Sequence, residues 1–218
     1  LLVMIHGGGY SSGDKNAWQN EAYTYSRAGY ICASLNYRLT QNGGNQDSLL
    51  RLYAIQCALE DIQNAIRFLK KNANTYFIDT SRGVDGSAGG ALSLLNAIEF
   101  DAAIGTNDHP GFSSKTNGSI ATGATLINDD PASQLGTLHY DSFDSPVLMF
   151  HAKENDSSTG ATWSGSAVPT QQAINNSGNS CTLVAQPNMT HTVVLELAGD
   201  YWQYLRPFLW EKLRLDEL

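Results

Sequence analysis

The chain is poor in charge, and positive charge is the scarcer sign. Only 16% of its 218 residues are charged, and 21 Asp and Glu outnumber 13 Lys and Arg, for a formal net charge of −8. This acidic balance argues against nucleic acid or an anionic membrane surface as the main partner. Since 42% of the residues are hydrophobic, we still expect a globular chain rather than a disordered one.

Long apolar runs and metal-binding patterns are also missing. No apolar run approaches the roughly 20 residues of a membrane-spanning helix. The three cysteines, Cys32, Cys57 and Cys181, lack the spacing of a metal site and are expected to be small core residues. No Walker loop, G-x-G-x-x-G motif or His/Cys cluster is present, so the sequence implies neither a metal nor a cofactor.

The length of 218 residues predicts a single domain, residues 1–218. The chain opens on the apolar run Leu1–Ile5 without an initiator methionine, so we expect further residues upstream. The sequence leaves the compartment open between cytoplasmic and secreted, and it leaves the oligomeric state open.

Short apolar strands alternate with amphipathic helices along the chain. This alternation predicts an α/β fold with a mostly parallel central sheet and helices on both faces. The expected strands are Leu1–Ile5, Tyr30–Leu35, Gly83–Asp85, Ser119–Gly123, Val147–His151 and Thr182–Gln186. The expected helices are Trp18–Ala28, Leu50–Lys71, Ala88–Ile98, Val168–Asn176 and Asp200–Leu215.

Three consecutive glycines follow the first strand, in the segment His6-Gly7-Gly8-Gly9-Tyr10. Glycines let the backbone turn sharply and expose its N–H groups without side chains in the way. Exposed N–H groups are what an acyl-transfer enzyme needs where a carbonyl oxygen becomes an oxyanion. The alternative is an ordinary glycine-rich turn. Tyr10 is the aromatic residue expected to line a substrate pocket, in preference to Trp18 and Trp163.

A serine lies where the third strand passes into a helix, in Asp85-Gly86-Ser87-Ala88-Gly89-Gly90. Such a turn exposes the serine side chain and places the next N–H at a helix N-terminus, where anions are favoured. A serine hydroxyl needs a base to become a nucleophile. The alternative for Ser87 is a helix N-cap without chemistry.

Of five histidines, His191 is the candidate base because it follows the last strand, in the chain order serine, acid, histidine. The acid is expected in the loop after Val147–Phe150, where Asp156 is favoured and Glu154 competes. A carboxylate there would fix the His191 tautomer and stabilise its imidazolium. His6 is expected to brace the glycine loop.

Two further expectations concern the surroundings of this site. Arg38 is expected to brace its loop through ion pairs, and Asp61 on the long helix is either its partner or merely an exposed charge. The stretch Phe100–Asn117 is expected to be a loop that covers the site, and Ser157–Ser166 is expected to be a loop as well.

These motifs together resemble the α/β-hydrolase fold, in its HGGG-bearing esterase and lipase branch. Members of that branch include hormone-sensitive-lipase-like carboxylesterases and feruloyl-type acyl esterases. The resemblance implies Ser87 as nucleophile, His191 as base and Asp156 as acid. It implies oxyanion donors at Gly8, Gly9 and the Ala88 N–H, and it places the family's first two strands upstream of Leu1.

Two positions depart from the family pattern. The family turn reads Gly-x-Ser-x-Gly, whereas Asp85 stands two residues before Ser87 here. Either this turn differs in geometry, or one residue, such as a chemically modified serine, is absent beside Ser87. In the acid loop, the family has Gly after its histidine and the aspartate one place earlier, whereas Ala152 follows His151 here.

The expected activity is that of a serine carboxylesterase acting on short-chain or small aryl esters through an acyl-enzyme. An amidase or formamidase would use the same machinery on another bond. The alternative outside enzymes is a non-catalytic hydrolase-fold protein that binds a small ligand.

Overall fold

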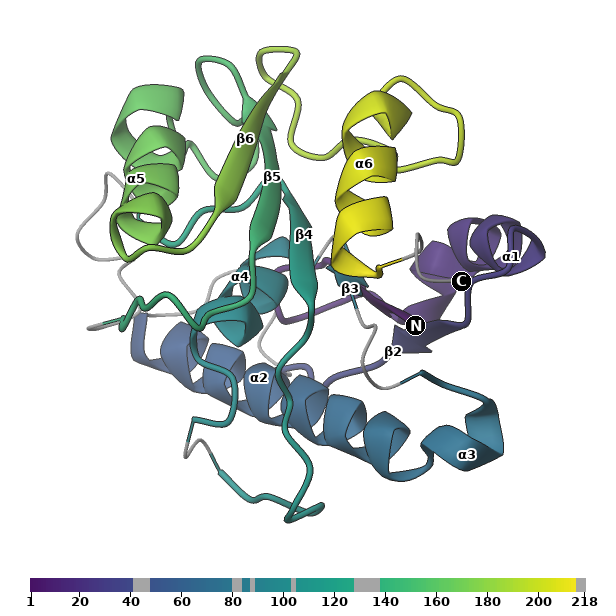
Figure 1. Cartoon of the computed structure of the whole chain (residues 1–218). Helices are drawn as coiled ribbons and strands as arrows, with labels where there is room; N and C mark the ends of the chain where they lie inside the picture. Colours follow the sequence, from purple (N-terminus) through teal and green to yellow (C-terminus); the bar gives the residue numbers. More distant parts are fainter. Residues whose placement is uncertain (41–47, 80–83, 87–88, 103–104, 128–137, 215–218) are drawn as a thin grey trace.

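The computed structural model describes residues 1–40, 48–79, 84–86, 89–102, 105–127 and 138–214. Its centre is a six-stranded sheet of order β2-β1-β3-β4-β5-β6 in which all neighbouring strands are parallel (Figure 1). The strands are β1 (Leu2–Ile5), β2 (Cys32–Leu35), β3 (Val84–Gly86), β4 (Gly118–Thr122), β5 (Val147–Ala152) and β6 (Cys181–Gln186). Since the strands are parallel, the loops that follow them gather at one edge of the sheet.

Helices cover both faces of the sheet, as the alternating sequence pattern predicts. On one face lie α2 (Ser48–Lys71), α4 (Gly90–Ile98) and α5 (Val168–Asn176). On the other lie α1 (Gln19–Arg27) and α6 (Trp202–Lys212), with α1 preceded by the 3-10 turn η1 (Lys15–Trp18) (Figure 1). The fold is therefore the expected α/β arrangement, a parallel sheet between two helical layers.

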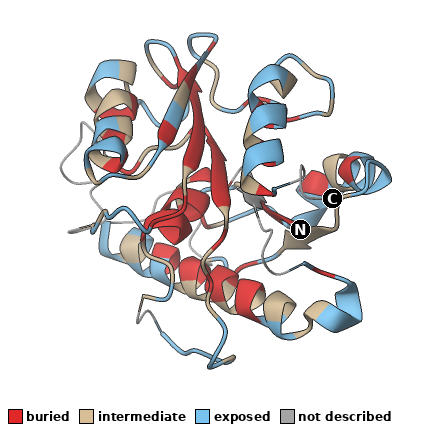
Figure 2. Cartoon of the chain, viewed as in Figure 1, coloured by how far each residue is buried: buried red, intermediate tan, exposed pale blue. Residues whose placement is uncertain are grey.

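Alternation along the strands divides the buried side chains into two cores. In β1, Val3 and Ile5 belong to the core under α2, α4 and α5, while Leu2 and Met4 belong to the core under α1 and α6. Strand β5 is buried along its whole length between both cores (Figure 2). A strand that buries both faces favours apolar residues at most positions, which explains the short apolar runs in the sequence.

The structure corrects two sequence-based expectations about loops. The described part of the stretch 100–117 runs along α2, where Asn64 donates to the Thr106 carbonyl (2.9 Å) and Arg67 pairs with Asp101 (3.0 Å). It does not cover the pocket described below. The end of the predicted loop 157–166 is helical, because Trp163–Ala167 forms the π-helical turn η3 that leads into α5. The short helix α3 (Ala73–Tyr76) was not predicted.

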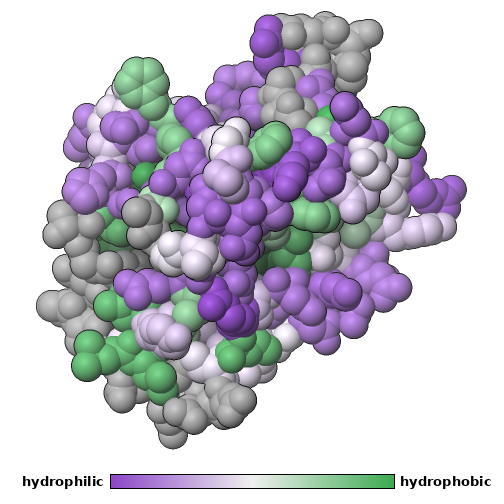
Figure 3. Space-filling view, turned by 90° about the horizontal axis from the view of Figure 1, so that it is seen from below, coloured by the Kyte–Doolittle hydropathy of each residue, from purple (hydrophilic) through white to green (hydrophobic). Residues whose placement is uncertain are grey.

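The cysteines are all free: Cys181 is buried, whereas Cys32 and Cys57 are half-buried. Within the described residues, no helix is both long and apolar enough to cross a membrane. The surface seen from below Figure 1 is mostly hydrophilic, with its apolar side chains in separate groups (Figure 3).

Candidate active site

A pocket of about 340 Å³ opens where β1 and β4 end. Its wall is built by the glycine loop after β1, the start of α4, the end of β4 and the loop after β6. Among the residues that line it are Gly8, Gly9, Tyr10, Arg51, Gly90, Gly123, Thr159 and His191. A volume of this size suits a small ligand.

The glycine loop has a left-handed backbone that favours glycine. Gly8 and Gly9 have φ of +112° and +60°, and Tyr10 follows at +64°. A Cβ on Gly8 would lie 2.1 Å from the Ser12 carbonyl oxygen, whereas one on Gly9 would meet no atom within 4 Å. A glycine at position 8 is therefore needed for the tight turn, whereas the space where a side chain of residue 9 would lie is open.

The loop is held from behind by His6 and Tyr37. His6 Nδ1 lies 2.7 Å from the Gly7 carbonyl oxygen, and the His6 ring stacks on Tyr37 at a centroid distance of 4.3 Å. The Tyr37 hydroxyl, in turn, donates to the carbonyls of His6 (3.0 Å) and Gly7 (3.3 Å). The expectation that His6 braces the glycine loop is confirmed.

These contacts leave the N–H groups of Gly8 and Gly9 without a hydrogen-bond partner among the residues that the structure describes. The Gly89 N–H is different, because it donates to the Ile5 carbonyl at 2.7 Å. Free N–H groups on the wall of a pocket are available to an oxygen atom of a ligand.

The start of α4 packs very closely against the ends of two strands. A Cβ on Gly89 would lie 2.2 Å from Ile5 Cγ2, and one on Gly90 would lie 2.9 Å from the Thr122 carbonyl oxygen. The Gly89-Gly90 pair is therefore required for packing. Ser87 and Ala88, the candidate nucleophile and its neighbour, lie outside the described residues.

His191 and Asp156 form a hydrogen-bonded pair at this pocket. His191 Nδ1 lies 2.8 Å and 3.1 Å from the two carboxylate oxygens of Asp156. The Asp156 side chain is fully buried and accepts two more hydrogen bonds, from the backbone N–H groups of Ser158 and Thr159. Burial alone would raise the pKa of Asp156, but these hydrogen bonds outweigh it and hold that pKa below its usual value.

The structure separates the two candidate acids. Glu154 accepts a hydrogen bond from Asn188 Nδ2 at 3.2 Å and so helps to join its own loop to the loop after β6. In the same place, the Asn155 N–H donates to Asn188 Oδ1 (2.8 Å). Asp156 is therefore the acid that contacts His191.

Three residues that the sequence did not single out position the His191 loop. Gln186 Nε2 donates to the Thr190 carbonyl (2.7 Å), and Thr122 Oγ1 accepts from the Val193 N–H (2.9 Å). Gly123, with φ of +63°, allows the closest approach, because a Cβ there would lie 1.9 Å from the His191 carbonyl oxygen. The only feature of the sequence that could have pointed to one of these residues is that Gly123 is a glycine at the end of a predicted strand.

The other candidates fall into structural roles. Tyr10 lines the pocket as expected, and burial raises its pKa to about 12. Trp18 belongs to the core on the opposite face and donates to the Ile5 carbonyl at 3.2 Å. Arg38 pairs with Asp61 as expected, with Nε 2.9 Å from both carboxylate oxygens.

Among the described residues, no three His, Cys, Asp or Glu side chains gather in a way that could hold a metal ion.

Comparison with known families identifies the chain. The BD-FAE family model, an α/β-hydrolase-fold esterase domain, matches residues 1–194. The chain belongs to the BD-FAE family. As a member, it is a carboxylic ester hydrolase with the α/β-hydrolase fold. No curated protein matches this BD-FAE chain in sequence.

Solved structures similar to this BD-FAE chain include those of Thermogutta terrifontis esterase 2. The form phosphorylated by paraoxon has 21% identity and a TM-score of 0.72, over 96% of this chain and 81% of that one. The butyrate-bound form has 18% identity and a TM-score of 0.71, over 99% and 80%. At this level of identity the likeness shows the shared fold alone.

Proposed function

We propose that residues 1–218 form one catalytic domain, a serine carboxylesterase that hydrolyses short-chain or small aryl esters through an acyl-enzyme. Ser87 is the nucleophile, His191 the general base and Asp156 the acid. The oxyanion is bound by the N–H groups of Gly8, Gly9 and Ala88.

One observation carries this proposal. His191 lines the same pocket as Gly8 and Gly9, whose N–H groups have no partner among the described residues, and Asp156 hydrogen-bonds to His191. A base oriented by a carboxylate and donors for a developing negative charge are the two parts that acyl transfer requires besides a nucleophile. In the sequence, Ser87 lies between β3 and Gly89, and Gly89 lines this pocket.

In the first half-reaction, Ser87 Oγ attacks the ester carbonyl carbon while His191 Nε2 takes the hydroxyl proton. The carbonyl oxygen becomes an oxyanion that accepts hydrogen bonds from the glycine loop. The bond to the alcohol oxygen breaks, His191 returns the proton to that oxygen, and the alcohol leaves. Water then repeats the sequence on the acyl-enzyme, so that the acid is released and the serine regenerated.

Asp156 contributes without exchanging a proton. Its carboxylate accepts a hydrogen bond from the Nδ1–H group of His191, which directs the other ring nitrogen toward the substrate and stabilises the imidazolium that forms. The lowered pKa of Asp156 keeps this carboxylate ionised at neutral pH.

The size of the pocket supports small substrates. About 340 Å³ holds a short acyl chain with a small alcohol or aryl group, and Tyr10 offers an apolar wall for either. The butyrate-bound and propionate-bound structures of the Thermogutta esterase show ligands of that size on the same fold.

The test is hydrolysis of p-nitrophenyl esters of increasing acyl length by the wild type and Ser87→Ala. We expect wild-type activity to be highest on short chains and Ser87→Ala to lose at least about a thousandfold in kcat. Ser26→Ala on α1, away from the pocket, is the matched control and should keep full activity.

Two results would contradict the proposal. A wild type inert on every ester would favour an amidase or a non-catalytic binding protein. An active Ser87→Ala would mean that a neighbouring residue attacks. In that case, the mass of the tryptic peptide that begins at Gly83 would show whether the turn contains one more residue than the printed sequence.

A further inference from the structure

Arg51 is the one permanently charged side chain among the described residues of the pocket wall. It lies in the first turn of α2 and shares the wall with Tyr10 and the glycine loop. The whole chain carries a formal charge of −8, so a positively charged side chain at this pocket contrasts with the net negative charge of the protein.

The other arginines of α2 and its neighbouring loop have clear structural partners. Arg38 pairs with Asp61, and Arg67 pairs with Asp101 at 3.0 Å. Arg51 forms no hydrogen bond or ion pair with any residue that the structure describes. An arginine that has no partner among the described residues and lies at the wall of a pocket can bind a group of the ligand.

The described residues of the pocket wall carry no negative charge that would compensate Arg51. Its electrostatic neighbour in the described pocket is the buried Tyr10, which is neutral at physiological pH. The nearest catalytic carboxylate, Asp156, is fully buried and already accepts hydrogen bonds from His191 and two backbone N–H groups. No Asp or Glu lines the pocket among the described residues.

We propose that Arg51 is a specificity residue that binds a carboxylate group carried by the ester substrate. This inference rests on the proposed esterase function and names its substrate class: esters whose acyl or alcohol part bears a second, free carboxylate. Arg51 is exposed, and its planar guanidinium matches a carboxylate with two parallel hydrogen bonds.

Two substrate pairs test the proposal and distinguish which part of the ester bears the charge. The acyl pair is p-nitrophenyl hemiglutarate and p-nitrophenyl valerate. The alcohol pair is 4-carboxyphenyl butyrate and 4-carbamoylphenyl butyrate. In each pair the readout is the ratio of kcat/KM for the anionic ester to that for the neutral one, so that general losses of activity cancel.

We expect Arg51→Gln to lower this ratio by about five- to tenfold for one of the two pairs. Arg51→Lys should keep much of the preference, because it keeps the charge but not the planar geometry, and Arg51→Glu should reverse it. High salt should weaken the wild-type preference. Arg27→Gln is the matched control, since Arg27 is an exposed arginine on α1 that lies over Tyr23 away from the pocket.

A loss in the acyl pair or in the alcohol pair supports the proposal and identifies the charged part. An unchanged ratio in both pairs for Arg51→Gln, with neutral esters still hydrolysed, overturns it while the esterase function stands. If no ester is hydrolysed, calorimetric binding of 4-hydroxybenzoate and of its uncharged amide decides. A preference for the acid that Arg51→Gln abolishes supports carboxylate binding, and no preference rejects it.

Discussion

At the scale of single residues, the site depends on which of two nearby carboxylates meets the histidine. Both follow β5 and are two positions apart, so the sequence favoured Asp156 without excluding Glu154. The structure buries Asp156 completely against His191 and engages Glu154 with Asn188. The difference lies in the path of the loop, which the backbone N–H groups of Ser158 and Thr159 help to fix by donating to the Asp156 carboxylate.

Asp156→Asn should lower kcat by about a thousand- to ten-thousandfold, because an amide neither fixes the His191 tautomer nor stabilises its cation.

Since the pKa of Asp156 lies below its usual 3.8, the aspartate is ionised above that pH. The stability it contributes is therefore present above its unfolded pKa and lost only as the pH falls through its folded value. We expect the kinetic defect at every pH from about 5 to 9, measured with a p-nitrophenyl ester.

Glu154→Gln is the control for this prediction. It keeps an oxygen for the hydrogen bond from Asn188, so its activity should stay within about threefold of wild type. If Glu154→Gln instead showed the large loss and Asp156→Asn did not, Glu154 would be the functional acid.

At the scale of elements, glycines bring the segments of the site together. Gly89 and Gly90 let α4 approach β1 and β4, and Gly123 lets the loop after β6 reach the end of β4. A methyl group at any of these positions would overlap a neighbouring element, and the overlap would move that element as a unit.

Gly123→Ala should displace His191 and reduce kcat/KM at least about a hundredfold, because misplacement of a catalytic group by about 1 Å has an effect of that order. A Cβ on Gly123 would lie 1.9 Å from the His191 carbonyl oxygen and 2.8 Å from His191 Nδ1. The measurement is ester hydrolysis, with circular dichroism to show that the variant is folded.

Gly111→Ala is the control that distinguishes the effect of this steric overlap from the effect of backbone strain. Gly111 also has positive φ, at +90°, but a Cβ there would meet no atom within 4 Å. Its alanine variant should lose stability, by about 1 kcal/mol, and keep its activity. Equal losses of activity in both variants would show that His191 tolerates the added methyl group.

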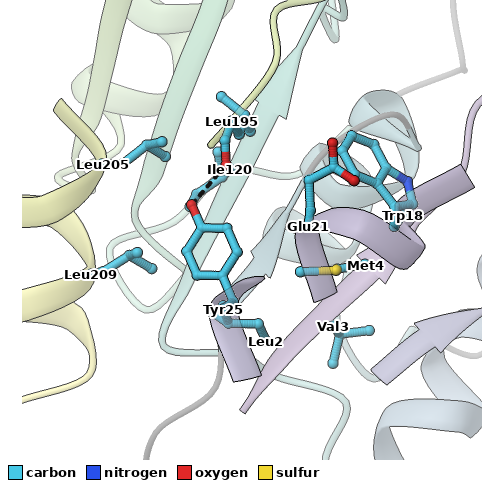
Figure 4. Close-up of a pocket in the computed structure, with 10 residues that line it drawn as sticks. All are labelled: Leu2, Val3, Met4, Trp18, Glu21, Tyr25, Ile120, Leu195, Leu205 and Leu209. Atoms are coloured by element: carbon cyan, nitrogen blue, oxygen red, sulfur yellow. Dashed lines mark hydrogen bonds between the residues drawn. The ribbon is translucent and has the colours of Figure 1, made fainter. Parts of the chain in front are cut away.

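At the scale of the whole molecule, the core under α1 and α6 secures the loop that carries His191. The Tyr25 hydroxyl on α1 donates to the Leu195 carbonyl at 2.8 Å, four residues beyond His191 (Figure 4). The apolar cavity around this contact has only about 40 Å³ and lies among core residues such as Leu2, Ile120 and Leu205. It is too small for a substrate, so its role is structural.

Tyr25→Phe should lower the free energy of unfolding by about 1 kcal/mol, because it leaves the buried Leu195 carbonyl without its donor. Urea unfolding measures the change. Tyr23→Phe is the matched control, since Tyr23 is 62% exposed on the same helix, and it should change stability by less than about 0.5 kcal/mol. An equal effect of both substitutions would argue against a special role of the Tyr25 contact.

The sequence alone was sufficient for the alternation of the six strands with α1, α2, α4, α5 and α6, because short apolar strands and an apolar stripe on α2 are local patterns. It also located the glycine loop and the histidine, since those motifs occupy consecutive residues after strands. The tertiary structure decided the rest: the contact of Asp156 with His191, the path of the stretch 100–117 along α2, and the places of Gly123 and Arg51 at the pocket. These depend on contacts between residues far apart in the chain, and such contacts leave no periodic signal in the sequence.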